Sequence, residues 1–264
     1  MFRDFSLIAG PCVLEGDELN LTVARAVAAW SETFGLPAIF KASFDKANRS
    51  RDDAPRGPGL EAGLECLRRV SGETGLPVLT DVHEPDQAAA VGAVVDVLQI
   101  PAFLCRQTDL LRAVGACGKP VNVKKGQWMA PEEMAGAVEK LKNAGAPEVA
   151  VTERGTFFGY GNLVVDMRAF ERLRAATGCP AIFDATHSVQ RPGGKADGAS
   201  AGDPGHIPAL TRAAVAAGCD GLFLETHPEP AAAPSDGSNM LPLDQVPDLL
   251  RQIVSIRAAL SDDS

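Results

Sequence analysis

The sequence contains no long apolar run and no export signal. Charged residues and prolines interrupt every apolar stretch before it reaches the length that spans a bilayer. The first residues, Met1 to Phe5, include Arg3 and Asp4 and lack the apolar segment and small-residue cleavage site of a signal peptide. We therefore expect a cytoplasmic protein that does not enter a membrane.

Paired cysteine motifs are also missing. The six cysteines are scattered, without a Cys-x-x-Cys pair, at Cys12, Cys66, Cys105, Cys117, Cys179 and Cys219. In a chain of 264 residues this pattern indicates reduced thiols in the cytosol and not a disulfide framework. Five of these cysteines fit the role of small buried apolar side chains. Cys12 calls for a different account, given below.

An excess of positive charge is absent as well. The chain has 25 Lys and Arg against 34 Asp and Glu, a net charge of −9, which argues against a broad nucleic-acid surface. We expect no nucleic-acid partner. A few cations can nevertheless dominate the field inside one pocket, so the charge balance does not exclude small anionic substrates.

What is present is a regular alternation of strand-like and helix-like segments. Eight short β-rich runs occupy residues 6–9, 38–42, 78–81, 97–100, 121–124, 149–152, 181–184 and 221–225. Glycine turns that stop helices precede several of them, at Gly35, Gly75, Gly118, Gly145, Gly178 and Gly218. Eight β–α units predict a single-domain (β/α)₈ barrel over residues 1–264. An open doubly wound sheet is the alternative, but no Gly-x-Gly-x-x-Gly turn follows the first run.

Between these runs, residues 131–144 and 163–176 have helical composition and spacing. Two long loops rich in Gly, Pro, Ser and Ala follow the last two runs, at 188–205 and 226–239. Loops of this length in a compact domain are commonly functional lids.

Polar side chains collect where the predicted strands end. In chain order they are Cys12, Lys41 with Lys46 and Arg49, Asp81 with His83, Gln99, Lys124, Arg154, Asp184 with His187, and Glu225. The C-terminal ends of all barrel strands meet at one face, which carries the active site in barrels of this kind. This clustering predicts a catalytic or binding pocket there.

Four residues of this set and its loops are candidate metal ligands. Cys12 follows the first strand, His187 the seventh and Glu225 ends the eighth, while Asp236 lies in the last long loop. These strands are neighbours in a closed barrel, so one thiolate, one imidazole and two carboxylates can converge on one divalent ion. Zn²⁺, Fe²⁺ and Mn²⁺ all suit this mixed set. The alternative is that Cys12 is a packed apolar side chain and His187 a hydrogen-bonded loop residue.

Five cations are expected to face the same pocket, namely Lys41, Lys46, Arg49, Lys124 and Arg154. A single lysine or arginine at a strand end is usually solvated. Five around one mouth would form a positive funnel suited to one phosphate, or to two held apart.

These residues lie within segments that resemble the signatures of the 3-deoxy-manno-octulosonate 8-phosphate synthases. The matching segments are Ile8-Ala-Gly-Pro-Cys12, Lys41-Ala-Ser-Phe-Asp-Lys-Ala-Asn-Arg-Ser50, Thr80-Asp-Val-His83, Leu98-Gln-Ile-Pro-Ala-Phe-Leu-Cys-Arg-Gln107, Val123-Lys-Lys-Gly-Gln127, Thr152-Glu-Arg-Gly155, Phe183-Asp-Ala-Thr-His-Ser188, Leu224-Glu-Thr-His-Pro228 and Asp236-Gly237. The resemblance covers essentially the whole chain. Related synthases that use erythrose 4-phosphate have Lys-Pro-Arg-Thr where this chain has Lys46-Ala-Asn-Arg49.

The resemblance implies an enzyme that condenses phosphoenolpyruvate with arabinose 5-phosphate in lipopolysaccharide precursor synthesis. It also implies a homotetramer. It further implies one divalent metal ion per subunit, because cysteine at position 12 resembles the metal-dependent branch of the family, whereas the metal-independent branch has asparagine there. The implied metal ligands are Cys12, His187, Glu225 and Asp236.

The resemblance also assigns roles to the substrate residues. It implies that Lys41, Ser43, Lys124 and Arg154 hold phosphoenolpyruvate, and that Asn48, Arg49 and Ser50 hold the aldose phosphate, with Arg106 reaching in from a neighbouring subunit. Gln99 is a further implied substrate-binding residue. Lys46, Asp81 and His83 are the implied catalytic residues: Lys46 polarises or protonates the aldehyde oxygen, and Asp81 and His83 are candidates for proton transfer. A purely structural role is the alternative for His83. Two positions depart from the pattern: Arg51 stands where a second serine is common, and loop 231–234 is alanine-rich.

Two other functions stay open on the residues alone. One is a Schiff-base aldolase that uses Lys124 as the amine, which requires a lysine tuned by its surroundings. The other is a non-catalytic sensor of sugar phosphates on a barrel scaffold, which would leave the metal ligands unexplained.

Overall fold

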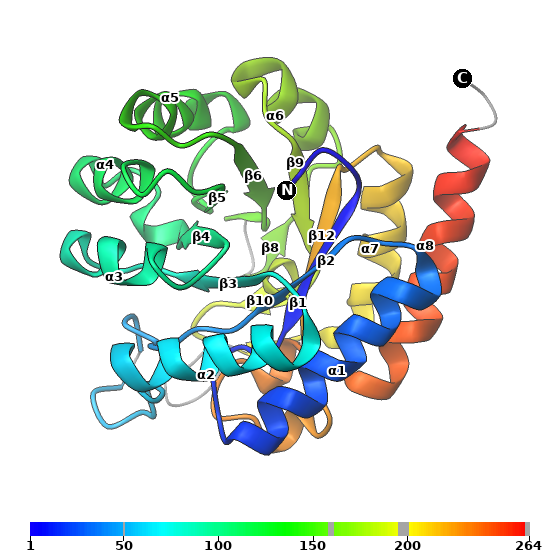
Figure 1. Ribbon diagram of the computed structural model, residues 1–264. Helices are drawn as coiled ribbons and strands as arrows, with labels where there is room; N and C mark the ends of the chain where they lie inside the picture. Colours follow the sequence, from blue (N-terminus) through cyan, green and yellow to red (C-terminus); the bar gives the residue numbers. More distant parts are fainter. Residues whose placement is uncertain (50, 158–160, 195–200, 262–264) are drawn as a thin grey trace.

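The computed structural model describes residues 1–49, 51–157, 161–194 and 201–261. Eight parallel strands form a closed ring, and helices surround it (Figure 1). The ring follows the order β1-β2-β3-β4-β5-β6-β9-β12, and β12 pairs back with β1 to close it. The strands are β1 (Ser6–Gly10), β2 (Ala38–Lys41), β3 (Val78–Asp81), β4 (Val97–Ile100), β5 (Val121–Lys124), β6 (Val149–Glu153), β9 (Ala181–Asp184) and β12 (Gly221–His227). The predicted (β/α)₈ barrel is therefore confirmed.

The strand bounds agree closely with the predicted runs. Strands β3, β4, β5 and β9 coincide with them, whereas β2 ends one residue early, at Lys41. Strands β1 and β6 continue for one residue and β12 for two. The extension of β12 is explained by a short parallel strand, β13 (Leu241–Pro242), that pairs with Thr226 and His227.

The outer layer consists of helices that follow the strands. They are α1 (Asp17–Phe34), α2 (Leu60–Thr74), α3 (Ala88–Gly92), α4 (Thr108–Gly115), α5 (Ala135–Ala144), α6 (Ala169–Thr177), α7 (Ile207–Ala216) and α8 (Val246–Ser261). The six glycines predicted to stop helices all have positive φ angles. Among the helices of the described ranges, none combines the length and apolar character needed to cross a membrane.

The prediction for residues 131–144 is confirmed, with one 3₁₀ turn, η3 (Pro131–Met134), before α5. The prediction for 163–176 is wrong at its beginning. Residues Leu163–Val164 form strand β8, which pairs antiparallel with β7 (Thr156–Phe157), and α6 begins only at Ala169. Asp166 accepts a hydrogen bond from the Arg168 backbone N–H, which turns the chain before the helix. Hairpin pairing thus outweighs the helical spacing of this segment.

Two apolar layers hold the barrel together. The inner layer fills the barrel with Phe2, Ile8, Ile39, Leu79, Val97, Ala150, Ile182 and Phe223, and a larger one packs the helices on the strands. Side chains alternate between the two sides of a strand. The next inward positions above Ile39, Leu79 and Ile182 are therefore Lys41, Asp81 and Asp184, all buried. The apolar layer is the floor of a polar chamber.

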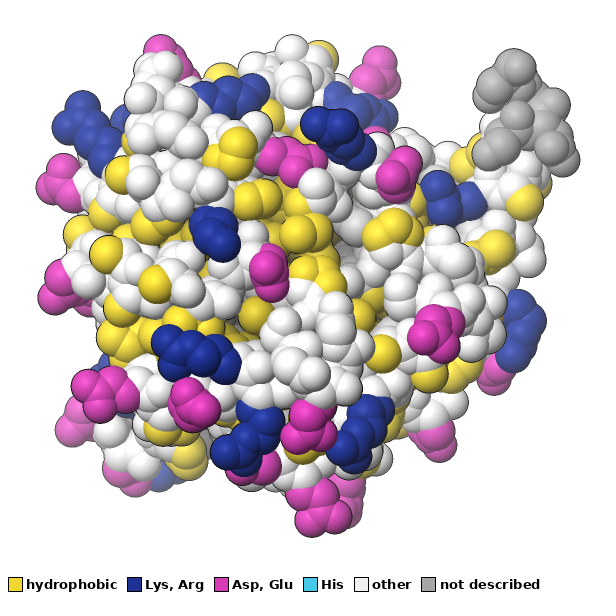
Figure 2. Space-filling model, viewed as in Figure 1, with side chains coloured by type: hydrophobic (Ala, Val, Ile, Leu, Met, Phe, Trp, Pro, Cys, Tyr) yellow, Lys and Arg dark blue, Asp and Glu magenta, His cyan; other side chains and the backbone are white. Residues whose placement is uncertain are grey.

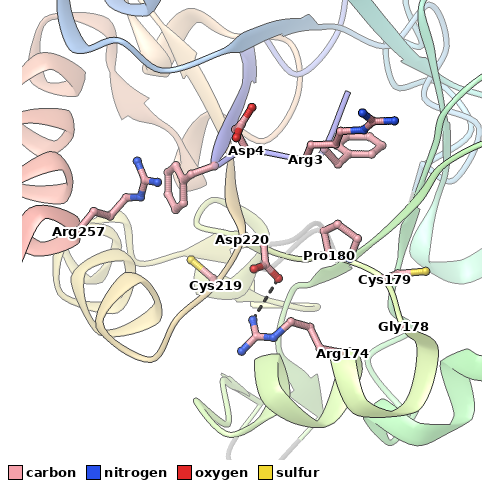
Figure 3. Close-up of a pocket in the computed structure, with 11 residues that line it drawn as sticks. Arg3, Asp4, Arg174, Gly178, Cys179, Pro180, Cys219, Asp220 and Arg257 are labelled. Atoms are coloured by element: carbon pink, nitrogen blue, oxygen red, sulfur yellow. Dashed lines mark hydrogen bonds and ion pairs between the residues drawn. The ribbon is translucent and has the colours of Figure 1, made fainter. Parts of the chain in front are cut away.

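The opposite, N-terminal end of the barrel has a shallow hollow of about 430 Å³ (Figure 3). Two of the three arginines that line it are already engaged: Arg174 donates to the Gly218 carbonyl and to Asp220, and Arg257 lies 4.2 Å from the Phe5 ring centroid. In the view of Figure 2, basic and acidic side chains are mixed over the surface. In barrels of this kind the N-terminal end contributes to stability, and the active site lies at the C-terminal end.

Candidate active site

A cavity of about 1060 Å³ opens at the C-terminal ends of the strands. Most of the predicted site residues line it: Lys41, Lys46, Asn48, Arg49, Asp81, His83, Gln99, Lys124, Arg154, His187, Glu225 and Asp236. Cys12 and Ser43 are buried next to lining residues, since Cys12 contacts Asp236 and Ser43 contacts Lys46. Arg106 is exposed and does not line the cavity of its own chain. Ser50 lies outside the described residues.

Three of the four predicted metal ligands come together on one side of this cavity. Cys12, Glu225 and Asp236 each offer a ligand atom, and these atoms all lie within 4.8 Å of one another. The Cys12 thiol donates a hydrogen bond to Asp236 Oδ2 at 3.3 Å. Asp236 has a φ of 53°, and it is the only non-glycine residue with positive φ in the described ranges. Such a conformation is strained and commonly marks a functional position.

His187 lies beside this group but outside it. Asp184 Oδ2 accepts from His187 Nδ1 at 2.8 Å, which leaves a lone pair on Nε2. That nitrogen is 3.6 Å from Glu225 Oε2, a buried oxygen without a hydrogen-bond partner among the described residues. Two lone pairs therefore face each other across a gap that suits a cation.

The pKa shifts of Cys12 and Asp236 are also consistent with a cation-binding site. Burial raises the pKa of the Cys12 thiol well above its usual value, and the Glu225 carboxylate raises it further. Burial opposes ionisation of Asp236 too, but His187 in its protonated form and Lys46 hold the pKa of Asp236 below the usual value. A neutral thiol beside two ionised carboxylates becomes a thiolate when a divalent cation is bound between them. The residues present therefore fit a divalent metal ion.

The cations of the chamber are paired with these acids. Lys41 Nζ donates to Glu225 Oε1 at 2.7 Å and to the Cys12 carbonyl at 3.0 Å. Lys124 Nζ lies 2.5 Å from Asp184 Oδ2 and 3.0 Å from the ring centroid of Phe223, the floor of the chamber. Burial lowers the pKa of Lys124 to about 8, although the Asp184 carboxylate opposes this shift.

Two more cations complete the positive part of the chamber. Arg154 is buried, and its Nη1 has no hydrogen-bond partner among the described side chains, so it is available to an anion. Lys46 donates to Ser43 Oγ at 3.0 Å. Burial opposes its charge, but the Cys12 thiol, once ionised, and the Glu225, Asp81 and Asp236 carboxylates raise the pKa of Lys46. Lys46 therefore keeps its proton at neutral pH.

Arg49 lies at the rim, where it joins two loops. Its guanidinium donates to Pro55 O on its own loop, and to Ser235 Oγ at 2.9 Å and Pro234 O at 2.7 Å on the loop after β12. The predicted phosphate-binding residues thus lie at two levels of the cavity. Lys124 and Arg154 are buried at strand ends, and Arg49 is at the rim.

Asp81 and His83 form a buried pair beside Lys46. His83 Nε2 lies 3.0 Å from Asp81 Oδ2, and the His83 ring packs edge-on against Phe44. Burial opposes ionisation of Asp81, but His83, Lys46 and Lys41 keep its pKa below the usual range. Asp81 is therefore an acceptor at neutral pH.

Three buried residues near the site were missed by the sequence reasoning. Thr152 Oγ1 donates to Asn122 Oδ1 at 2.6 Å, and Asn122 Nδ2 donates to Gln99 Oε1 at 2.9 Å, which turns the Gln99 amide nitrogen away from Asn122. Asn122 and Thr152 each lie two positions before a predicted cation, Lys124 or Arg154. The alternation of side chains along a strand could therefore have identified them. Gln190, which contacts Arg154, lies in a two-residue strand within the long connection between β9 and α7, where the sequence carries no such pattern.

Comparison with known proteins places the chain in a family. Residues 3–261 match the DAHP synthetase I family. The 2-dehydro-3-deoxyphosphooctonate aldolase of Syntrophotalea carbinolica is 52% identical over 259 residues, which covers 98% of this chain and 93% of the relative. Proteins of the same name from Nitratidesulfovibrio vulgaris and Acidithiobacillus ferrooxidans are 54% and 55% identical, covering 95% and 94% of this chain and 91% and 87% of the relatives. The chain therefore belongs to the DAHP synthetase I family and, within it, to the 2-dehydro-3-deoxyphosphooctonate aldolases.

Proposed function

We propose that this protein condenses phosphoenolpyruvate with D-arabinose 5-phosphate and water, giving 3-deoxy-D-manno-octulosonate 8-phosphate and inorganic phosphate for lipopolysaccharide precursor synthesis. The observation that carries the proposal is the arrangement of cations at two levels of one cavity, beside a group of acids. Buried Lys124 and Arg154 suit one anionic group, and Arg49 in the rim suits a second phosphate.

The substrate roles follow from these levels. Lys41, Ser43, Gln99, Lys124 and Arg154 hold phosphoenolpyruvate in the chamber, and Asn48, Arg49 and Ser50 hold the aldose and its distal phosphate. Arg154 Nη1 is a buried donor that no described residue engages. The Asn122 contact leaves the Gln99 amide N–H groups to donate to an anionic ligand.

The reaction then proceeds by carbon–carbon bond formation without a Schiff base. The C3 carbon of phosphoenolpyruvate attacks the aldehyde carbon. Lys46, which is protonated at neutral pH before this step, donates a proton to the aldehyde oxygen. Water adds at C2, with the Asp81–His83 pair as the acceptor of its proton. The hemiketal phosphate formed in this way expels inorganic phosphate by C–O cleavage.

We also propose one divalent ion per subunit, Zn²⁺, Fe²⁺ or Mn²⁺, held by Cys12, Glu225, Asp236 and the lone pair of His187. Such an ion supplies Lewis acidity beside the reacting groups. The chemistry of the donors supports the fit, because a buried thiol lies close to a carboxylate oxygen of Glu225 that has no hydrogen-bond partner within the described part of the chain.

The assembly that we propose is a homotetramer in the cytoplasm, with the whole chain acting as one domain. The exposed aromatic rings of Phe103 and Trp128 lie 6.2 Å apart near the cavity mouth, and Arg106 is exposed on the same segment as Phe103. A neighbouring copy that covers these rings would bring Arg106 toward the aldose phosphate of the next site.

The direct test is phosphate release from phosphoenolpyruvate with a set of aldose phosphates, with and without a chelator. Release that depends on arabinose 5-phosphate supports the proposal. Sugar-phosphate binding without phosphate release would support the sensor alternative and contradict it.

The pH dependence separates the proposal from a Schiff-base aldolase. Because the ammonium form of Lys124 binds anions and its pKa is about 8, kcat/KM for phosphoenolpyruvate is expected to fall as the pH rises above 8. A lysine that forms a Schiff base reacts as the free amine, so its activity would rise over the same range. The measurement is kcat/KM across this range, with Lys124→Arg as the control whose charge persists.

Oxygen labelling tests the bond that is cleaved. Water attack at C2 places solvent oxygen in the ketose product and none in the released phosphate. The reaction is run in ¹⁸O-labelled water, and both products are analysed by mass spectrometry. Label in the phosphate would indicate P–O cleavage and contradict the proposed steps.

A further inference from the structure

Gln190 lies between Arg154, one of the buried cations of the chamber, and Asp236, one of its acids. It belongs to strand β10 (Gln190–Arg191), which pairs antiparallel with β11 (Ala201–Gly202). Its side chain is largely buried and lines the cavity. Arg154 Nη2 donates to its Oε1 at 2.5 Å, and its Nε2 donates to Asp236 Oδ1 at 2.9 Å.

The orientation of this amide follows from chemistry alone. A guanidinium has only donors, so the amide oxygen must face Arg154. An ionised carboxylate has only acceptors, so the amide nitrogen must face Asp236. Glutamine is therefore matched at both ends, and neither a charged nor an apolar side chain of similar length satisfies both partners.

The hydrogen bond from Gln190 is one of the contacts that hold the Asp236 carboxylate in place. Asp236 is held in its left-handed conformation with Oδ1 accepting from Gln190 and from Asn239 Nδ2, at 2.9 and 3.3 Å. Opposite Gln190 in the β10–β11 pair stands Gly202, and a Cβ there would lie 1.5 Å from Asn239 Oδ1. The hairpin, Gln190 and Asn239 thus form one support behind the carboxylate that faces Cys12.

The contact continues to the rim. Ser235 Oγ donates to Asp236 Oδ2 at 3.1 Å and accepts from Arg49 Nη1 at 2.9 Å. A continuous path of hydrogen bonds therefore connects Arg154, at the buried level, with Arg49, at the rim. Gln190 is the side chain in this path that contacts both a buried cation and the acid group.

We propose that Gln190 is a positioning residue that couples Arg154 to Asp236, so that phosphoenolpyruvate and the divalent ion bind cooperatively. The inference rests on the proposed function. An anion on Arg154 and a cation at Asp236 each favour the arrangement in which Gln190 contacts both side chains, so each ligand prepares the site of the other. Such coupling is reciprocal by thermodynamic necessity.

The experiment measures the dissociation constant of phosphoenolpyruvate by titration calorimetry, with the full chain either metal-free or loaded with Mn²⁺. For the wild type we expect binding at least about fivefold tighter with Mn²⁺. In Gln190→Met, which fills the space without polar contacts, we expect the ratio to fall below about twofold. Gln190→Glu, which keeps the contact to Arg154 but repels Asp236, is the second variant and should lose the coupling as well.

Asn239→Ala is the matched control, because Asn239 contacts Asp236 without contacting Arg154. It should weaken Mn²⁺ binding, measured by the electron paramagnetic resonance of free Mn²⁺, and keep the coupling ratio. A wild type without coupling, or a Gln190→Met variant with the wild-type ratio, would overturn the inference while phosphate release stays intact. Failure of the wild type to bind phosphoenolpyruvate at all would instead contradict the proposed function.

Discussion

Replacing Cys12 with alanine is expected to remove the bound divalent ion and to lower kcat by about 10²- to 10³-fold. The thiol is the one soft donor of the group and lies within 4.8 Å of the Glu225 and Asp236 ligand atoms. Lewis-acid stabilisation is worth several kcal/mol, and each step of about 1.4 kcal/mol is a factor of ten in rate. Metal content by elemental analysis and turnover by phosphate release provide the measurements. Prolonged chelation of the wild type should have the same effect, reversed by added metal.

The control is Cys219→Ala, which removes another buried thiol at the opposite end of the barrel. It should keep both metal and turnover. Cys12→Asn should retain more activity than Cys12→Ala, because an amide N–H can donate to Asp236 Oδ2 where the thiol does now. Full activity in a wild-type preparation without metal would rule out the metal-dependent assignment.

Replacing Arg49 with alanine is expected to lower kcat/KM for arabinose 5-phosphate by about 10²-fold and to leave phosphoenolpyruvate affinity within about twofold. Two charge-assisted hydrogen bonds to a phosphate are lost, each worth about 1.5–3 kcal/mol, partly compensated by water. Arg49 is hydrogen-bonded to Pro234 and Ser235 at the rim, whereas Lys124 lies on the chamber floor. Steady-state kinetics with each substrate varied in turn separates the two effects.

Arg51→Ala is the matched control for Arg49. Arg51 also lines the cavity, but its guanidinium is already bound bidentately by Asp53. Its replacement should change kcat/KM for arabinose 5-phosphate and the affinity for phosphoenolpyruvate by less than about threefold each.

The same assay compares two sugars. The shorter erythrose 4-phosphate cannot both contact Arg49 and place its aldehyde over phosphoenolpyruvate. Equal kcat/KM for both sugars would refute the aldose assignment and leave the phosphoenolpyruvate site standing.

The barrel itself was predictable because its determinants are local. Runs such as 78–81 and 181–184 are short and β-rich, and glycines that end helices precede them. Strands in a closed parallel barrel all deliver their last residues to one face, so the clustering of Lys41, Asp81 and Lys124 followed from the fold class alone. The resemblance to a known family then supplied the roles.

The sequence could not determine which of these side chains pair. Lys41 and Glu225 are 184 positions apart, and their 2.7 Å contact depends on the β1–β12 pairing that closes the ring. Whether His187 directs Nε2 or Nδ1 to the acids depends on Asp184, which only the folded turn brings into contact. The Lys41–Glu225 contact is set by strand register and not by local spacing.

By itself, then, the sequence determined the eight strands, the face on which the site lies and the residue types present there, because period, turn residues and strand ends are local properties. The tertiary structure decided the rest. It turned residues 163–164 into a hairpin strand, left Arg106 outside its own cavity and held Asp236 in a left-handed conformation. It also placed Gln190 between Arg154 and Asp236. The contacts of Gln190 join residues 36 and 46 positions apart, and the strand at 163–164 exists only through its pairing with 156–157. Packing and pairing override local preference wherever the two disagree.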